Sequence, residues 1–203
     1  MYDRTKLALI AMKRLLQYLL AAWMVCSLTT RLDAADADQA VIETTLGTVT
    51  IEFWSDVAPK SVANFKQLAK EGFYNGTVFH RIIHGFLAQA GDPLTKDPSK
   101  ENQWGKGGPN VAIDAEFNGR AHQFGVISMA PYKAPNKSGS QFFFCLGNAP
   151  QLDGKCSPFG KVVSGQDVLK KLGEVAVKAA ANGERSKPGE RIEIKSIKIQ
   201  PAE

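Results

Sequence analysis

Three polar side chains stand inside otherwise apolar segments of this 203-residue sequence, and they are the first candidates for chemistry. Arg81 interrupts the segment 79–83, Gln89 lies within 86–90, and Gln141 directly precedes three phenylalanines. A polar group in an apolar strand needs a hydrogen-bonding partner inside the protein, or it serves a ligand. Each residue alone is more typical of a structural hydrogen bond. The three together, surrounded by aromatic residues, leave a ligand-binding role open.

Other arrangements of catalytic residues have little support. His80 and His84 would share one face if their β-rich segment formed a single strand, but no Cys or Glu is close enough in the sequence to complete a metal site. Six residues separate Gly147 from Gly154-Lys155, where a phosphate-binding loop has four. No Ser, His and Asp pattern indicates a hydrolase, and Cys156 with a distant histidine is a weak protease motif. We expect neither a metal nor another cofactor.

Short β-strands must position these side chains. The segments 41–44 and 49–53 flank a turn around Gly47 and predict a hairpin. Apolar runs follow at 78–83, 86–90, 126–129, 142–146 and 159–163, separated by Gly, Pro, Asn and Asp. In the last strand, 192–199, isoleucines stand at even-numbered positions before Lys195-Ser196 and at odd-numbered positions after it. This change of alternation predicts a bulge.

Two helices complete the expected fold. Val62, Phe65 and Leu68 recur at helical spacing between Pro59 and Gly72, and a second helix is predicted over 166–172. Many short strands with only two helices favour an antiparallel barrel that is closed or nearly closed. The long loop 92–110 is expected to carry function, because long loops on a rigid barrel often do. One domain, 38–203, is the simplest organisation.

The first 37 residues have a different character. Lys13 and Arg14 precede the apolar stretch 15–28, and Ala35-Asp36-Ala37 matches a signal-peptidase site, so residues 1–37 are expected to be a signal peptide. A short membrane-anchoring helix is the alternative, and translation could also begin at Met12. We therefore expect an exported protein, periplasmic or secreted. No apolar run reaches the roughly 20 residues of a membrane-spanning helix.

Charge and cysteine content exclude further classes. The net charge of +5 is spread along the chain without a basic run, so no nucleic-acid partner is expected. Cys145 and Cys156 follow the predicted signal peptide. Because Cys145 lies in an apolar run, a buried free thiol is favoured over a disulfide.

Several blocks of the sequence resemble one family, the cyclophilin-type peptidyl-prolyl cis-trans isomerases. The longest is FHRIIHGFLAQAGD, from Phe79 to Asp92. Further blocks in the same order and spacing are GVISMA at 125–130, SGSQFF at 138–143, and LDGK at 152–155 leading to FGKV at 159–162. The segment PKSVANF at 59–65 is similar to the first helix of the family.

This resemblance implies a mainly β fold, a closed eight-stranded antiparallel barrel capped by two α-helices. It implies that Arg81 is the catalytic arginine and that the proline ring binds among Phe86, Leu87, Phe143 and Leu152. Gln89 and Gln141 would hold Arg81 and the substrate backbone, and Ala130 would line the neighbouring groove. The expected partners are proline-containing segments of folding proteins, bound by a monomer without cofactor. A proline-binding chaperone with little turnover is the alternative function.

Four positions depart from the family pattern. Gln151 stands where many members have Trp, Cys156 where a His is common, and His84 where Pro is common. Pro131 and an extra residue near Tyr132 change the groove after Ala130. Because cyclosporin-type inhibitors depend on that Trp in the family, we expect them to bind weakly. None of the four replaces Arg81, so isomerase activity is expected to remain.

Overall fold

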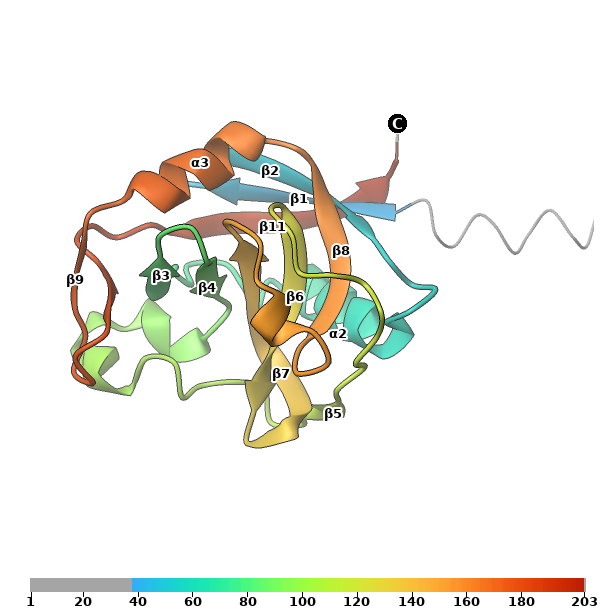
Figure 1. Ribbon diagram of the computed structural model, residues 1–203, viewed down its shortest axis with the longest axis horizontal. Helices are drawn as coiled ribbons and strands as arrows, with labels where there is room; N and C mark the ends of the chain where they lie inside the picture. The colour runs from blue at the N-terminus through green and yellow to red at the C-terminus, as the bar shows by residue number, and fades with distance from the viewer. Residues whose placement is uncertain (1–37, 203) are drawn as a thin grey trace, which may run out of the picture. The chain divides into compact units, whose positions relative to one another are not determined.

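The computed structural model describes residues 38–202 (Figure 1). The predicted signal peptide and the alternative start at Met12 lie outside the described residues. The strands are β1 Asp38–Thr44, β2 Gly47–Phe53, β3 Arg81–Ile83, β4 Leu87–Ala90, β5 Ile113–Asp114, β6 Val126–Tyr132, β7 Ala134–Cys145, β8 Ser157–Ser164, β9 Val177–Ala179, β10 Arg185–Pro188 and β11 Ile194–Pro201. The helices are α2 Pro59–Lys70 and α3 Gln166–Glu174, with the 3₁₀ helices η2 Pro93–Lys96, η3 Pro98–Gln103 and η4 Pro150–Leu152. No helix within 38–202 is long and apolar enough to cross a membrane.

One antiparallel sheet organises the fold. Its strands follow the order β11-β1-β2-β8-β6-β7-β4-β3, and β5 pairs with β7 beside this path. β9 and β10 form a separate two-stranded sheet. Figure 1 shows α3 next to β2 and α2 beside β8. The expected antiparallel β-fold with two α-helices is thus confirmed in its coarse form.

The closed ladder of eight strands is not confirmed. The sheet is curled, and its end strands β3 and β11 do not pair with each other as strands in the described part of the chain. β3 has only three residues, because the segment before it turns toward the residues that precede β11. There the Phe79 amide donates to the Ile192 carbonyl at 2.9 Å, and the Ile194 amide to the Thr77 carbonyl at 2.8 Å.

The predicted local features occur with small shifts. α2 begins at Pro59, whose missing amide hydrogen costs nothing at a helix start, and buries Val62, Phe65 and Leu68 as expected. α3 continues two residues beyond the predicted end. The predicted bulge is present: Ser196 pairs with Glu43 and Ile194 with Thr44, so Lys195 has no opposite residue.

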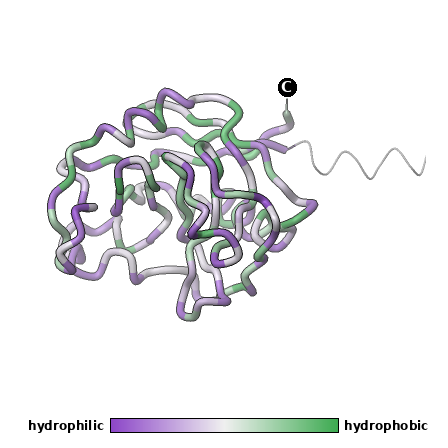
Figure 2. The backbone as a smooth tube through the Cα atoms, viewed as in Figure 1, coloured by the Kyte–Doolittle hydropathy of each residue, from purple (hydrophilic) through white to green (hydrophobic). Residues whose placement is uncertain are grey.

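In Figure 2, hydrophilic and hydrophobic residues follow each other at short intervals along the described chain.

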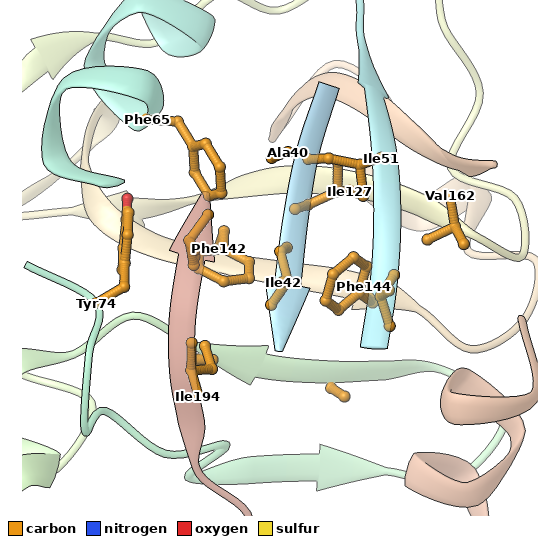
Figure 3. Close-up of a cluster of buried hydrophobic side chains, with 14 of the residues drawn as sticks. Ala40, Ile42, Ile51, Phe65, Tyr74, Ile127, Phe142, Phe144, Val162 and Ile194 are labelled. Carbon is orange, nitrogen blue, oxygen red and sulfur yellow. The ribbon is translucent and has the colours of Figure 1, made fainter. Parts of the chain in front are cut away.

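Aromatic rings fill the core between α2 and the concave side of the sheet. The Phe65 ring from α2 lies 5.1 Å from Tyr74, 5.4 Å from Phe142 and 5.2 Å from Phe159, measured between centroids. Figure 3 shows Phe65, Tyr74 and Phe142 directed toward one another. Such pairs add about 0.5–1.5 kcal/mol each beyond their buried area. The core therefore fixes α2 and β7 as a rigid support for the other face of the sheet.

Candidate active site

The strand register places the predicted site residues in one row. Arg81 on β3 is opposite Gln89 on β4, Gln89 is opposite Phe143 on β7, and Phe143 is opposite Ser128 on β6. Directly paired residues point to the same face of a sheet, and residues two positions along a strand share that face. Leu87 and Gln141 therefore lie on the same face as the row. We call this surface the site face.

The alternate residues of the same strands face the core. Ile82, Ala88, Phe142 and Phe144 are fully buried in the main hydrophobic cluster. The apolar run 142–146 thus divides by strand alternation into two faces. One face stabilises the fold, while the other is available for a site.

Arg81 is held by two partners. Its Nε and Nη2 donate to the two carboxylate oxygens of Glu184, at 2.8 Å and 2.9 Å, and its Nη1 donates to Gln89 Oε1 at 3.4 Å. The Gln89 amide in turn donates to Gln141 Oε1 at 2.8 Å. A guanidinium has five N–H donors, so these contacts leave two for a ligand.

Gln141 connects this network to the long loop 92–110. Its side-chain amide donates to the carbonyls of Gly105 and Gly107, at 2.9 Å and 2.8 Å. The buried Asp92 carboxylate holds the same loop by accepting the amides of Leu94, Gly105 and Gly107. A Cβ at Gly107 would collide with this carboxylate, so only glycine fits there. The loop thus borders the candidate site.

The apolar part of the site lies next to the row. Leu87, Ala130 and Phe143 are almost fully buried in one cluster, against which Phe86 and Leu152 pack while remaining partly exposed. Leu152 ends the 3₁₀ helix η4. Among these five residues, the partly exposed side chains are therefore Phe86 and Leu152, while Leu87, Ala130 and Phe143 are buried beside them. The structure therefore brings all predicted site residues into one region.

A histidine network on this face was not predicted from the sequence. His122 Nδ1 lies 2.7 Å from Asp153 Oδ1, and its Nε2 lies 3.0 Å from Ser128 Oγ. The His122 ring also stacks on Phe143, with a centroid separation of 5.9 Å. The order Asp–His–Ser is that of a hydrolase, but Ser128 is fully buried and no substrate reaches it. The network therefore supports Phe143. The contact could not be predicted from the sequence, because Asp153 is 31 positions from His122.

A cavity opens beside Arg81. It has a volume of ≈ 750 Å³, and Arg81, Gln89 and Glu184 line it together with Trp104 and Lys106 of the long loop. The hydrogen bonds from Arg81 hold the pKa of Glu184 at about 2, so this carboxylate is charged at neutral pH. The cavity therefore contains a charged pair, Arg81 and Glu184, next to the row that leads to Phe143.

Metal ligands and reactive thiols do not gather at this site. Within the described residues, no group of three His, Cys, Asp or Glu side chains could hold a metal ion. The strand that would align His80 with His84 ends at Ile83, so the expected shared face does not form. Cys145 and Cys156 are free and buried, and burial raises their pKa values to about 12 and about 11.

Comparison with known proteins decides the family. The model of the cyclophilin type peptidyl-prolyl cis-trans isomerases matches residues 40–199. The chain belongs to this family. A peptidyl-prolyl cis-trans isomerase of Synechococcus elongatus is 38% identical to this cyclophilin over 147 residues, which are 72% of this chain and 91% of the relative. One of Helicobacter pylori is 43% identical over 138 residues, 67% of this chain and 80% of the relative.

Longer relatives and a solved structure agree with this assignment. The matched part covers only 24% of the isomerase-like 2 protein of Cryptococcus neoformans, which is 44% identical over 140 residues. The crystal structure of a Cryptosporidium parvum cyclophilin, determined in the presence of the dipeptide Ala-Pro, has a TM-score of 0.70 and 33% identity. It covers 80% of this chain and 98% of that one. The cyclophilin-like fold is thereby confirmed.

The departures from the family pattern lie around the site of this cyclophilin. Gln151 and His84 are exposed, while Cys156 is buried in the apolar cluster. Pro131 precedes Lys133, which has a positive φ of 62°, in the β6–β7 hairpin. None of them contacts Arg81 through a hydrogen bond.

Proposed function

We propose that this cyclophilin accelerates cis-trans rotation of X–Pro bonds during the folding of secreted or envelope proteins. The observation that carries the proposal is the row of Arg81, Gln89 and Phe143 across three paired strands, with the apolar cluster of Leu87, Ala130 and Phe143 beside it. An arginine with two unused N–H donors next to an apolar cluster suits a proline-containing peptide better than a substrate that must be cut.

The reaction needs neither a nucleophile nor a general base. Rotation about a peptide bond meets a barrier of roughly 18–20 kcal/mol, because amide resonance must be broken. When the prolyl nitrogen becomes pyramidal, its lone pair localises and can accept a hydrogen bond. The remaining donors of Arg81 stabilise this twisted state more than either planar isomer, which is the condition for catalysis.

The other residues hold the substrate in position for this step. The proline ring is bound by Phe86, Leu87, Phe143 and Leu152 while the preceding residue rotates. Gln89 and Gln141 orient Arg81 and bind the peptide backbone, and Ala130 lines the groove for an extended segment. Uncatalysed isomerisation takes about 10–100 s, so millisecond turnover requires about 10⁴–10⁵-fold acceleration. One preorganised donor supplies about 10²–10³-fold, and orientation supplies the rest.

The cellular setting rests on the N-terminal pattern. The basic residues, the apolar stretch 15–28 and Ala35-Asp36-Ala37 support export to the periplasm or the outside of the cell. The partners are then proline-containing segments of unfolded exported proteins, bound by a monomer. Cyclosporin-type inhibitors bind weakly, since the exposed Gln151 offers no indole ring.

The decisive experiment compares the wild-type chain with Arg81→Ala. Cis-to-trans conversion of a proline tetrapeptide is measured for both, with circular dichroism as the control for folding. We expect the folded variant to lose at least about 100-fold in kcat/KM, as for loss of one preorganised donor. Equal turnover in both proteins would refute the mechanism. Binding of the peptide by both proteins without turnover would instead establish a proline-binding module.

A further inference from the structure

The hairpin formed by β9 and β10 brings a carboxylate to the candidate catalytic arginine. β10 lies beside β3, and the turn of the hairpin carries Glu184, which is 103 positions from Arg81 in the sequence. We propose that Glu184 is a positioning residue that fixes the Arg81 guanidinium for catalysis. This inference rests on the proposed function of Arg81.

The backbone of the turn holds Glu184 firmly. The Glu184 amide donates to Asn182 Oδ1 at 3.1 Å, and its carbonyl accepts the Ala180 amide at 2.7 Å. Gly183 has a φ of 82°, which a side chain would strain. An ion pair of 2.9 Å between Lys187 and Glu101 ties the hairpin to η3. The carboxylate is therefore presented from a braced turn.

The contact fixes the orientation of the guanidinium. Glu184 binds the edge formed by Nε and Nη2, while Gln89 binds Nη1 from the other side. A planar group held on both sides cannot rotate about its terminal bonds. The two unused N–H groups thus keep one direction before the substrate arrives, which is the preorganisation that a transition-state donor requires.

Charge alone would give Glu184 the opposite effect. A carboxylate beside the guanidinium lowers the positive potential that acts on the prolyl nitrogen, so a purely electrostatic role would slow the reaction. Both side chains are about one-third exposed, at 32% and 33%, and water screens part of this effect. Orientation and charge therefore predict opposite changes in turnover when Glu184 is replaced.

The test measures kcat and KM of the full chain for a proline tetrapeptide. We expect Glu184→Ala to lower kcat about 10-fold with KM within about twofold, because misplacing a reacting group by 1 Å can cost about 10²-fold. Glu184→Gln keeps an acceptor oxygen and should recover part of this loss. The matched control is Glu43→Gln on β1, which removes an exposed carboxylate that forms an ion pair with Lys195 on β11, outside the cavity and the hairpin. It should leave kcat within about twofold of the wild type.

Three outcomes separate the possibilities. A loss of kcat in Glu184→Ala, partly restored in Glu184→Gln and absent in Glu43→Gln, supports positioning. Unchanged or faster turnover in Glu184→Ala, or an equal loss in the control, overturns it. Arg81→Ala is measured alongside: if it turns over like the wild type, the proposed function fails as well, whereas an inactive Arg81→Ala with an unaffected Glu184→Ala rejects only the role of Glu184.

Discussion

Between pH 6.5 and 4, acidification should destabilise this protein mainly through His80. Both of its ring nitrogens are buried, and neither has a hydrogen-bonding partner among the described residues. Burial lowers the pKa of His80 from 6.5 to about 4; the carboxylate of Asp92 opposes this shift and the charge of Arg81 adds to it. The folded protein thus keeps this ring neutral at a pH where an exposed histidine is protonated.

The sign and size follow from proton linkage. Between pH 6.5 and 4 the unfolded chain binds a proton at His80 and the folded chain does not, so the free energy of unfolding falls as the pH falls. Because one unit of separation between the two pKa values is worth roughly 1.4 kcal/mol, the loss across this window is about 3 kcal/mol. That is a large share of the roughly 5–15 kcal/mol typical of a whole domain. The pKa of Glu184 is lowered to about 2, so the stability that its ionised form contributes is lost mainly below pH 4.5.

Urea unfolding at pH 7, 6, 5 and 4 measures this effect. His80→Leu places an apolar side chain of similar size among the same neighbours and should remove most of the acid loss. His84→Leu, at an exposed histidine close by in the sequence, is the matched control and should retain it. If His80→Leu loses as much stability as the wild type between pH 6.5 and 4, the assignment to His80 is wrong.

Four further changes have defined outcomes. Gln141→Met leaves two loop carbonyls without donors, so the free energy of unfolding in urea should fall by about 2–4 kcal/mol and isomerase activity should fall with it. Tyr74→Phe removes a buried hydroxyl without a partner in the described structure, and urea unfolding should show unchanged stability or a gain of up to about 1 kcal/mol. Cys145 and Cys156, with raised pKa values, should react with a thiol reagent at pH 7.5 only after unfolding. Gln151→Trp should raise the affinity for cyclosporin measured by calorimetry; an unchanged dissociation constant would point to the groove after Ala130.

The sequence was informative wherever the strand period was clear. The apolar runs in the sequence correctly located β4, β6, β7 and β8. The change in isoleucine alternation at Lys195 correctly located the bulge. The candidate residues Arg81, Gln89 and Phe143 could be named because they stand in such runs, and the family resemblance supplied their roles. Their alignment in one row depended on the register between strands, which the sequence alone does not determine.

The features that could not be predicted from the sequence have a different cause. The β9–β10 hairpin was not predicted, because Val177–Ala179 and Arg185–Pro188 have no apolar alternation and bury little. In the sequence, the neighbours of Glu184 mark it only as a surface carboxylate. The fold alone brings it to Arg81. The strand count predicted a closed or nearly closed barrel and the family resemblance a closed one, but β3 and β11 do not pair as strands, and only the residues around Val78 and Glu193 join the two ends of the sheet.

The two halves of the site therefore respond differently to mutation. The apolar half is built from the outer residues of strands whose inner residues form the core, so substitutions at Leu87 or Phe143 should change stability and binding together. The polar half depends on Arg81, which lies on a three-residue strand at the end of the sheet path. Its orientation comes from Gln89 on one side and Glu184 on the other. Substitutions in the hairpin should consequently alter turnover while leaving the global unfolding free energy nearly unchanged.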